Sequence, residues 1–105
     1  MELWNRIKIT VLKKVYFDDI AAENLSDEMK NEGHGICNIF KEEQEFFLSN
    51  PDDMPKGFCP WAWADLHRDV VAMLTGSQMK WNKDGVAISC CTDGYRPVVF
   101  RIERV

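Results

Sequence analysis

Apolar and polar residues alternate near the beginning of the chain. Ile7, Ile9 and Val11 occupy every second position, and the polar side chains of Lys8 and Thr10 stand between them. Because successive side chains of a strand point to opposite faces, this alternation predicts a half-buried β-strand over residues 6–15.

A second alternating region, residues 86–103, predicts a β-hairpin around a turn at residues 92–96. A two-residue Asp-Gly loop would pair Ser89 with Val98 and break the apolar face, whereas a three-residue loop pairs Cys90 with Val98. We expect the three-residue loop, because the buried pattern of a strand pair sets its register.

Two segments show helical spacing. Residues 60–75 begin with Pro60 and are followed by Gly76, which favour the first turn and the end of a helix respectively. The apolar stripe of this helix comprises Trp63, Leu66, Val70, Met73 and Leu74. A shorter helix is expected at residues 19–31. Its inner face carries Phe17, Ala21, Leu25 and Met29.

The middle of the chain predicts two short strands in residues 36–48, around a polar turn at 41–44, and then a loop at 49–57 that contains two prolines. The element order is therefore β-α-β-β-α-β-β. It predicts an α+β fold: a small antiparallel sheet with two helices packed on it, ending in a C-terminal β-hairpin. Residues 1–105 are expected to form a single domain.

Charge and composition narrow the class of protein. The net charge of -4 argues against binding to nucleic acid or to an anionic membrane surface. No apolar run approaches the length of a membrane span, and the first residues lack the basic and apolar blocks of a secretory signal. We therefore expect a cytoplasmic protein that binds neither nucleic acid nor membranes, and its oligomeric state is left open.

The four cysteines are candidates for chemistry, because cytoplasmic cysteines are more often thiols or metal ligands than disulfides. Cys59 precedes the predicted helix, whose dipole stabilises a thiolate, so it is a candidate nucleophile, redox thiol or metal ligand; filling a small space in the core is the alternative. Cys90 faces the core in the expected register, and Cys91 faces away from it. With Cys37 these residues form a candidate set for zinc or an iron–sulfur cluster, although no Cys-x-x-Cys pair is present.

A candidate ligand site lies between the start of the long helix and the turn at 92–96. Arg96 offers a planar fork suited to carboxylate or phosphate, and Asp65 is expected either to pair with it or to bind the same ligand. Aromatic side chains would form the apolar walls. The candidate ligand-binding residues are Cys59, Trp61, Trp63, Asp65, Cys91, Asp93, Tyr95 and Arg96.

Three sequence blocks resemble a family of small uncharacterised prokaryotic proteins of about one hundred residues. The blocks are residues 37–40 with 44–46 (Cys-x-x-Phe…Gln-Glu-Phe), 57–63 (Gly-Phe-Cys-x-Trp-Ala-Trp) and 90–98 (Cys-Cys-Thr-Asp-Gly-x-Arg-Pro-Val). Asn38 stands where the family usually has proline, and Glu43 where it often has glycine. The resemblance implies no reaction. It implies a shared site that includes Cys37, Cys59, Cys90, Cys91, Asp93 and Arg96.

Three functional hypotheses follow. The first is a binding or accessory module for a small molecule or a protein partner, with its site between the 60–75 helix and the 92–96 turn. The second is a cysteine-based protein, either metal-binding or a thiol redox protein. The third is a structural subunit whose aromatic surface is covered by a partner. Catalytic residues are not identified by any motif in the chain.

Overall fold

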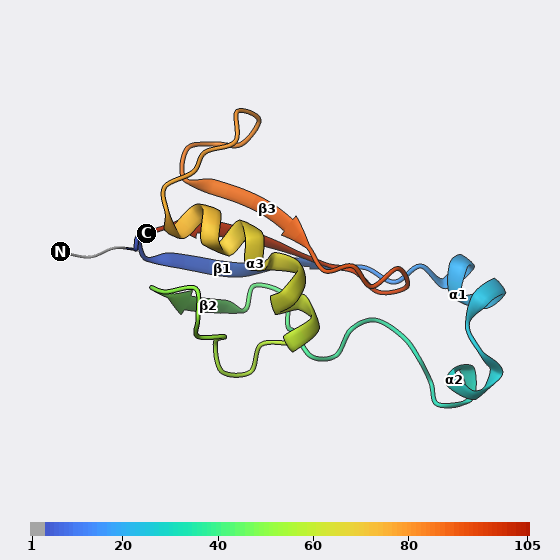
Figure 1. Ribbon diagram of the computed structural model, residues 1–105. Helices are drawn as coiled ribbons and strands as arrows, with labels where there is room; N and C mark the ends of the chain where they lie inside the picture. Colours follow the sequence, from blue (N-terminus) through green and yellow to red (C-terminus); the bar gives the residue numbers. More distant parts are fainter. Residues whose placement is uncertain (1–3) are drawn as a thin grey trace.

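The computed structural model describes residues 4–105 and contains one four-stranded antiparallel sheet (Figure 1). Its strands are β1 (Ile7–Lys14), β2 (Glu45–Leu48), β3 (Val86–Cys90) and β4 (Val98–Arg104), in the spatial order β2-β1-β4-β3. β1 and β4 are the central strands, and β3 and β4 form the C-terminal hairpin. The predicted α+β class and antiparallel sheet are confirmed.

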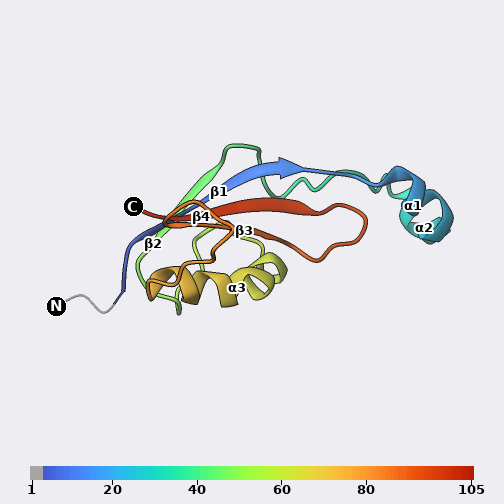
Figure 2. The same ribbon diagram turned by 90° about the horizontal axis from the view of Figure 1, so that it is seen from above.

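The helix α3 (Pro60–Leu74) lies along one face of this sheet, and Figure 2 shows it from above. Its apolar stripe faces the sheet: Leu66, Val70, Met73 and Leu74 are buried, as predicted, together with Ala62. Gly76, just beyond the helix, has a φ of 92° that favours glycine. The opposite face of the sheet, which we call the open face, is covered by none of the three helices in residues 4–105.

The core lies between α3 and the sheet. The alternation predicted for β1 is confirmed, because Ile7, Ile9 and Val11 are all fully buried in the core on the side of the sheet that carries α3. A cluster of phenylalanine rings fills the end of the core near the start of α3, with ring centroids between 4.9 and 6.0 Å apart. These rings belong to Phe40, Phe46, Phe58 and Phe100.

The helix predicted at residues 19–31 is divided into α1 (Asp18–Asn24) and α2 (Asp27–Asn31). Leu25 is extended, and the Ser26 side chain accepts a hydrogen bond from the Met29 N–H, which starts a new helix instead of continuing the first. The predicted inner face is wrong, because only Ala21 is buried and Phe17 and Met29 are exposed. Both short helices extend beyond the end of the sheet rather than packing on it.

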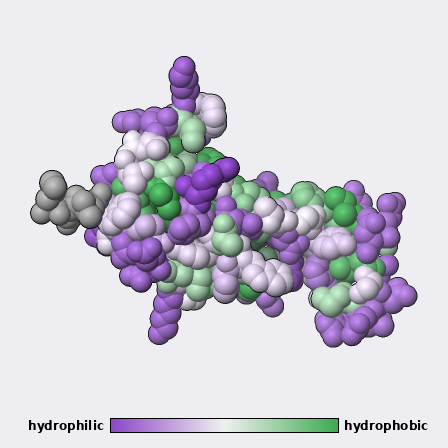
Figure 3. Space-filling view, in the orientation of Figure 1, coloured by the Kyte–Doolittle hydropathy of each residue, from purple (hydrophilic) through white to green (hydrophobic). Residues whose placement is uncertain are grey.

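We call residues 16–36 the helical arm. In the space-filling view it stands apart from the body of the molecule (Figure 3). Two backbone hydrogen bonds join its base to the end of the hairpin, from Val15 N to Pro97 O and from Phe17 N to Tyr95 O. The Tyr16 hydroxyl also lies 3.2 Å from Nδ1 of His34, so the two ends of the arm are held together.

Only one of the two strands predicted in residues 36–48 forms. This strand is β2, and the residues before it are bends and turns, so Cys37 and Phe40 enter the core from a loop. Glu43 has a φ of 70°, a backbone conformation that glycine adopts at lower cost. Its N–H nevertheless donates to the Val11 carbonyl at 2.7 Å, so the ladder between β1 and β2 extends into the turn.

The hairpin register differs by one residue from the predicted one. Cys90 pairs with Val99 and Ser89 with Phe100, and the Cys91 N–H donates to the Val98 carbonyl. The core face of β3 therefore carries the small side chains of Ala87 and Ser89, and Cys91, just beyond the strand, lies on the same side. We attribute this register to α3, which packs over β3 and leaves room there for small side chains, while Ile88 is placed on the open face.

Candidate functional site

A cavity of about 560 Å³ opens between the start of α3 and the loop that connects β3 to β4. Its volume lies within the range of small-molecule sites. Three separate parts of the chain contribute to it, and most of the lining side chains are apolar or thiols. The lining residues are Cys37, Ile39, Phe40, Cys59, Pro60, Trp61, Ala62, Asp65, Cys91, Thr92, Asp93, Arg96 and Val98.

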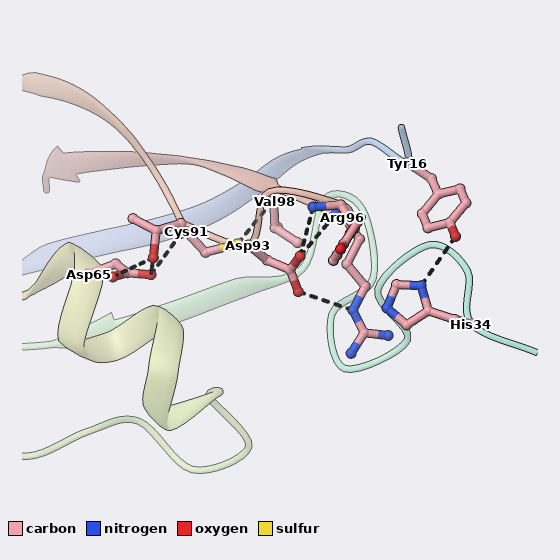
Figure 4. A network of polar contacts seen from close by, with 9 residues as sticks. Tyr16, His34, Asp65, Cys91, Asp93, Arg96 and Val98 are labelled. Atoms are coloured by element: carbon pink, nitrogen blue, oxygen red, sulfur yellow. Dashed lines mark hydrogen bonds and ion pairs between the residues drawn. The ribbon is translucent and has the colours of Figure 1, made fainter. Parts of the chain in front are cut away.

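Asp65 joins the first turns of α3 to the β3–β4 loop (Figure 4). Its carboxylate accepts the Thr92 N–H at 2.8 Å and the Thr92 hydroxyl at 3.0 Å. The expected Asp65–Arg96 ion pair is not among the contacts of residues 4–105, and each of the two side chains has a different partner. Asp65 thus holds one wall of the cavity against the other.

Asp93 organises the turn that carries Arg96. Its Oδ1 accepts the N–H groups of Tyr95 and Arg96 at 2.9 and 3.2 Å, and its Oδ2 accepts Nε of Arg96 at 3.3 Å. Burial by itself raises the pKa of the Asp93 carboxyl. The hydrogen bonds and the charge of Arg96 outweigh this effect, so the pKa lies below its ordinary value of 3.8.

The lowered pKa predicts a pH dependence of stability. A carboxyl whose pKa is depressed by folding stabilises the protein fully above its unfolded pKa, and this contribution is lost as the pH falls through the folded pKa. The difference in unfolding free energy between the wild type and Asp93→Asn should therefore be greatest above pH 3.8 and shrink at lower pH. Urea unfolding at several pH values measures it. Asp84→Asn, at an exposed position, is the control, and a difference that stays constant with pH would contradict the assignment.

Three of the four cysteines line the cavity, namely Cys37, Cys59 and Cys91. Cys91 was expected to face away from the core, but it is half-buried and packs against the core, and its Sγ accepts the Val98 N–H at 3.2 Å. Cys90 was expected to face the core and is exposed instead. The one-residue change of register exchanges the two faces.

The thiol of Cys90 has a raised pKa. Although the residue is exposed, partial burial of its sulfur, together with the nearby Cys91 thiol and Asp65 carboxylate, raises the pKa of the Cys90 thiol above its ordinary value of 9.0. Its Sγ donates to the Cys91 carbonyl at 3.1 Å. Cys90 is therefore predominantly protonated at neutral pH, the form that is the poorer nucleophile.

The predicted metal set does not converge. Within residues 4–105, no group of three or more Cys, His, Asp or Glu side chains has the arrangement needed to hold a metal ion. Cys90 does not line the cavity that the other three cysteines share. The zinc or iron–sulfur hypothesis therefore gains no support from the positions of these side chains.

Two of the aromatic residues proposed for the ligand site, Trp63 and Tyr95, do not line the cavity. Trp63 packs against Phe58 and against His67, whose Nε2 lies 2.8 Å from the Pro51 carbonyl oxygen. Tyr95 packs edge-on against His34 at the base of the helical arm. Of the candidate ligand-binding residues, the cavity brings together Cys59, Trp61, Asp65, Cys91, Asp93 and Arg96.

Several cavity residues were not among the predicted ligand-binding residues. They are Cys37, Ile39, Phe40, Pro60, Ala62, Thr92 and Val98. Cys37 was proposed only as a metal ligand. The signal in the sequence was that Cys37 and Phe40 belong to one motif block, Ala62 to a second, and Thr92 and Val98 to a third. No local pattern places the first block against the start of α3.

Comparisons with protein-family models, curated proteins and solved structures found no match to this chain. The resemblance of the three motif blocks to a family of small prokaryotic proteins therefore stays a prediction. Over the part of the chain that the structure describes, none of the helices has the length and apolar character needed to span a membrane.

Proposed function

We propose that this protein is a small-molecule-binding accessory module, and that its ligand occupies the cavity between α3 and the β3–β4 loop. The observation that carries the proposal is the cavity itself: about 560 Å³, with mainly apolar walls and a few convergent polar groups. Ligand sites have this composition, because apolar walls supply affinity and a few polar groups fix orientation. We further propose a cytoplasmic location, because none of the four cysteines forms a disulfide.

Trp61 provides the sharpest test, because the chain contains a matched control. Trp61 lines the cavity and is 82% exposed, whereas Trp81 is 81% exposed in a loop outside it. In a fragment screen monitored by amide NMR, we expect hits to shift the resonances of Ala62, Thr92 and Val98. Trp61→Ala should weaken their binding about tenfold, through the loss of aromatic contact and buried area, while Trp81→Ala should change it little.

Neither substitution should lower the unfolding free energy by more than about 0.5 kcal/mol, because both side chains are exposed. Fragments that bind only outside the cavity, or equal effects of the two tryptophan substitutions, would show that the proposed site is wrong. The third hypothesis, a subunit whose apolar surface is covered by a partner, predicts self-association or capture of a defined protein instead of fragment binding.

A second candidate function rests on the three thiols that line the cavity, Cys37, Cys59 and Cys91. A thiol-dependent protein would use one of them as nucleophile or redox group. Metal and labile-sulfide analysis of protein purified without air, together with a free-thiol count, distinguishes this function from the ligand-binding module. Stoichiometric metal or rapid alkylation of one cavity thiol at neutral pH favours the cysteine-based function, and four slowly reacting thiols without metal favour the ligand-binding module.

A further inference from the structure

Arg96 has hydrogen-bonding capacity that the protein does not use. Asp93 accepts its Nε at 3.3 Å, and within residues 4–105 the terminal nitrogens Nη1 and Nη2 have no hydrogen-bond partner. Figure 4 shows these two nitrogens beyond the Asp93 carboxylate. An arginine that is held at Nε presents its outer edge to a planar or tetrahedral oxyanion with two parallel N–H groups.

The two carboxylates of the cavity are already hydrogen-bonded. Asp65 accepts the N–H and the hydroxyl of Thr92, and Asp93 accepts two backbone N–H groups as well as Nε of Arg96. Their negative charges are thus stabilised by protein donors. Arg96 is the polar group in the lining whose donors point to no acceptor, and Asp93 fixes its position before any ligand arrives.

The apolar residues that line the cavity determine the chemical character of the rest of the ligand. Ile39, Phe40 and Trp61 line the same cavity as Arg96. Burying apolar surface against such side chains contributes roughly 25 cal/mol per Å², whereas a charged or strongly polar body would lose its hydration there. The cavity therefore combines an apolar wall with a single cation, Arg96, whose terminal nitrogens have no acceptor within residues 4–105.

We propose, on the basis of the ligand-binding function above, that the cavity binds a molecule with one oxyanion group on an apolar body, and that Nη1 and Nη2 of Arg96 hold the oxyanion. Carboxylate and phosphate share the required chemistry. The ligand class is therefore apolar carboxylates or phosphate monoesters.

Four matched probes test the class: naphthylacetate, naphthyl phosphate, the neutral naphthylacetamide and the cationic naphthylethylamine. Amide NMR titrations in a buffer free of carboxylate and phosphate give their dissociation constants. We expect at least one anion to bind about tenfold or more tightly than both the amide and the amine, and to shift the Arg96 and Ala62 resonances. The charge-assisted hydrogen bonds account for this difference.

Arg96→Gln should weaken binding of the tighter-binding anion by about tenfold to a hundredfold and leave binding of the amide unchanged. The anion affinity of Arg96→Lys should lie between those of the wild type and Arg96→Gln, because lysine keeps the charge but loses the planar fork. The control is Arg101→Gln, since Arg101 pairs with Glu103 outside the cavity. Native amide spectra confirm that the variants fold, and Arg96→Lys tests the proposal even where Arg96→Gln disturbs the turn.

The possible failures are distinguishable. If the amide or the amine binds the cavity as tightly as the anions, or if Arg96→Gln does not change anion affinity, the oxyanion class is wrong and the ligand-binding function stands. The same holds if uncharged fragments bind and no anionic probe does. If neither the probes nor the fragments bind the cavity at millimolar concentration, both proposals are wrong.

Discussion

Replacing Phe100 with alanine is expected to lower the free energy of unfolding by about 3–5 kcal/mol. Phe100 is fully buried, and its ring lies 5.1 Å from that of Phe40 and 5.5 Å from that of Phe58. The substitution removes apolar surface from the centre of the core and leaves a cavity that rigid neighbours fill only in part. Since small domains are stable by about 5–15 kcal/mol, urea unfolding should show a protein near the limit of folding.

Phe47→Ala is the control for this prediction. Phe47 lies on β2 but points to the open face, is 49% exposed, and has the Arg6 guanidinium 5.2 Å from its ring centre. Its truncation should cost no more than about 1 kcal/mol, because little apolar surface leaves a buried environment. Equal losses for Phe47 and Phe100 would contradict a core that lies on only one side of the sheet.

Replacing Asp65 with alanine is expected to have the second-largest effect, a loss of about 1–3 kcal/mol. The substitution leaves the Thr92 N–H and hydroxyl without the acceptor that holds the β3–β4 loop against α3. Hydrogen exchange of the Thr92 amide should become faster, because opening of the loop no longer breaks a bond to a carboxylate. Asp65→Asn keeps an acceptor oxygen and should lose less.

Asp69→Ala is the matched control on the same helix. Its side chain is only 18% exposed, but its carboxylate makes no hydrogen bond with residues 4–105 and lies 3.9 Å from Nε of the almost fully exposed Arg68, and so long an ion pair contributes little. We expect a change within about 0.5 kcal/mol and an unaltered exchange rate at Thr92. If Asp65→Ala is no more destabilising than Asp69→Ala, the contact between Asp65 and Thr92 does not form in solution.

The elements with a regular apolar period could be predicted from the sequence. Residues 6–15 follow a period of two and residues 60–75 a helical period, and these become β1 and α3 with the expected buried faces. The period reflects which side chains of one element face the core, so it can be read without knowing the partner. Part of the candidate site was predictable for the same reason, since Cys59 and Asp65 lie at the start of a recognisable helix.

The short and irregular segments could not be predicted in this way. Residues 19–31 have helical spacing, but Ser26 starts a second helix, and little tertiary packing favours one continuous helix in the arm. Residues 36–40 are mostly apolar but do not form a strand. Cys37 and Phe40 lie in a loop, and their side chains are buried in the core. Local propensity is too weak in such segments to outweigh the contacts that distant residues offer.

The sequence by itself therefore determined the class of fold, the two regular elements with their buried faces, and several polar residues of the cavity. The tertiary structure alone decided the hairpin register, which exchanged the faces of Cys90 and Cys91, and it alone brought Cys37, Ile39 and Phe40 against the start of α3. The physical reason is the range of the interactions. Periodicity depends on neighbours along the chain, whereas register and cavity lining depend on how much space α3 leaves above β3 and β4.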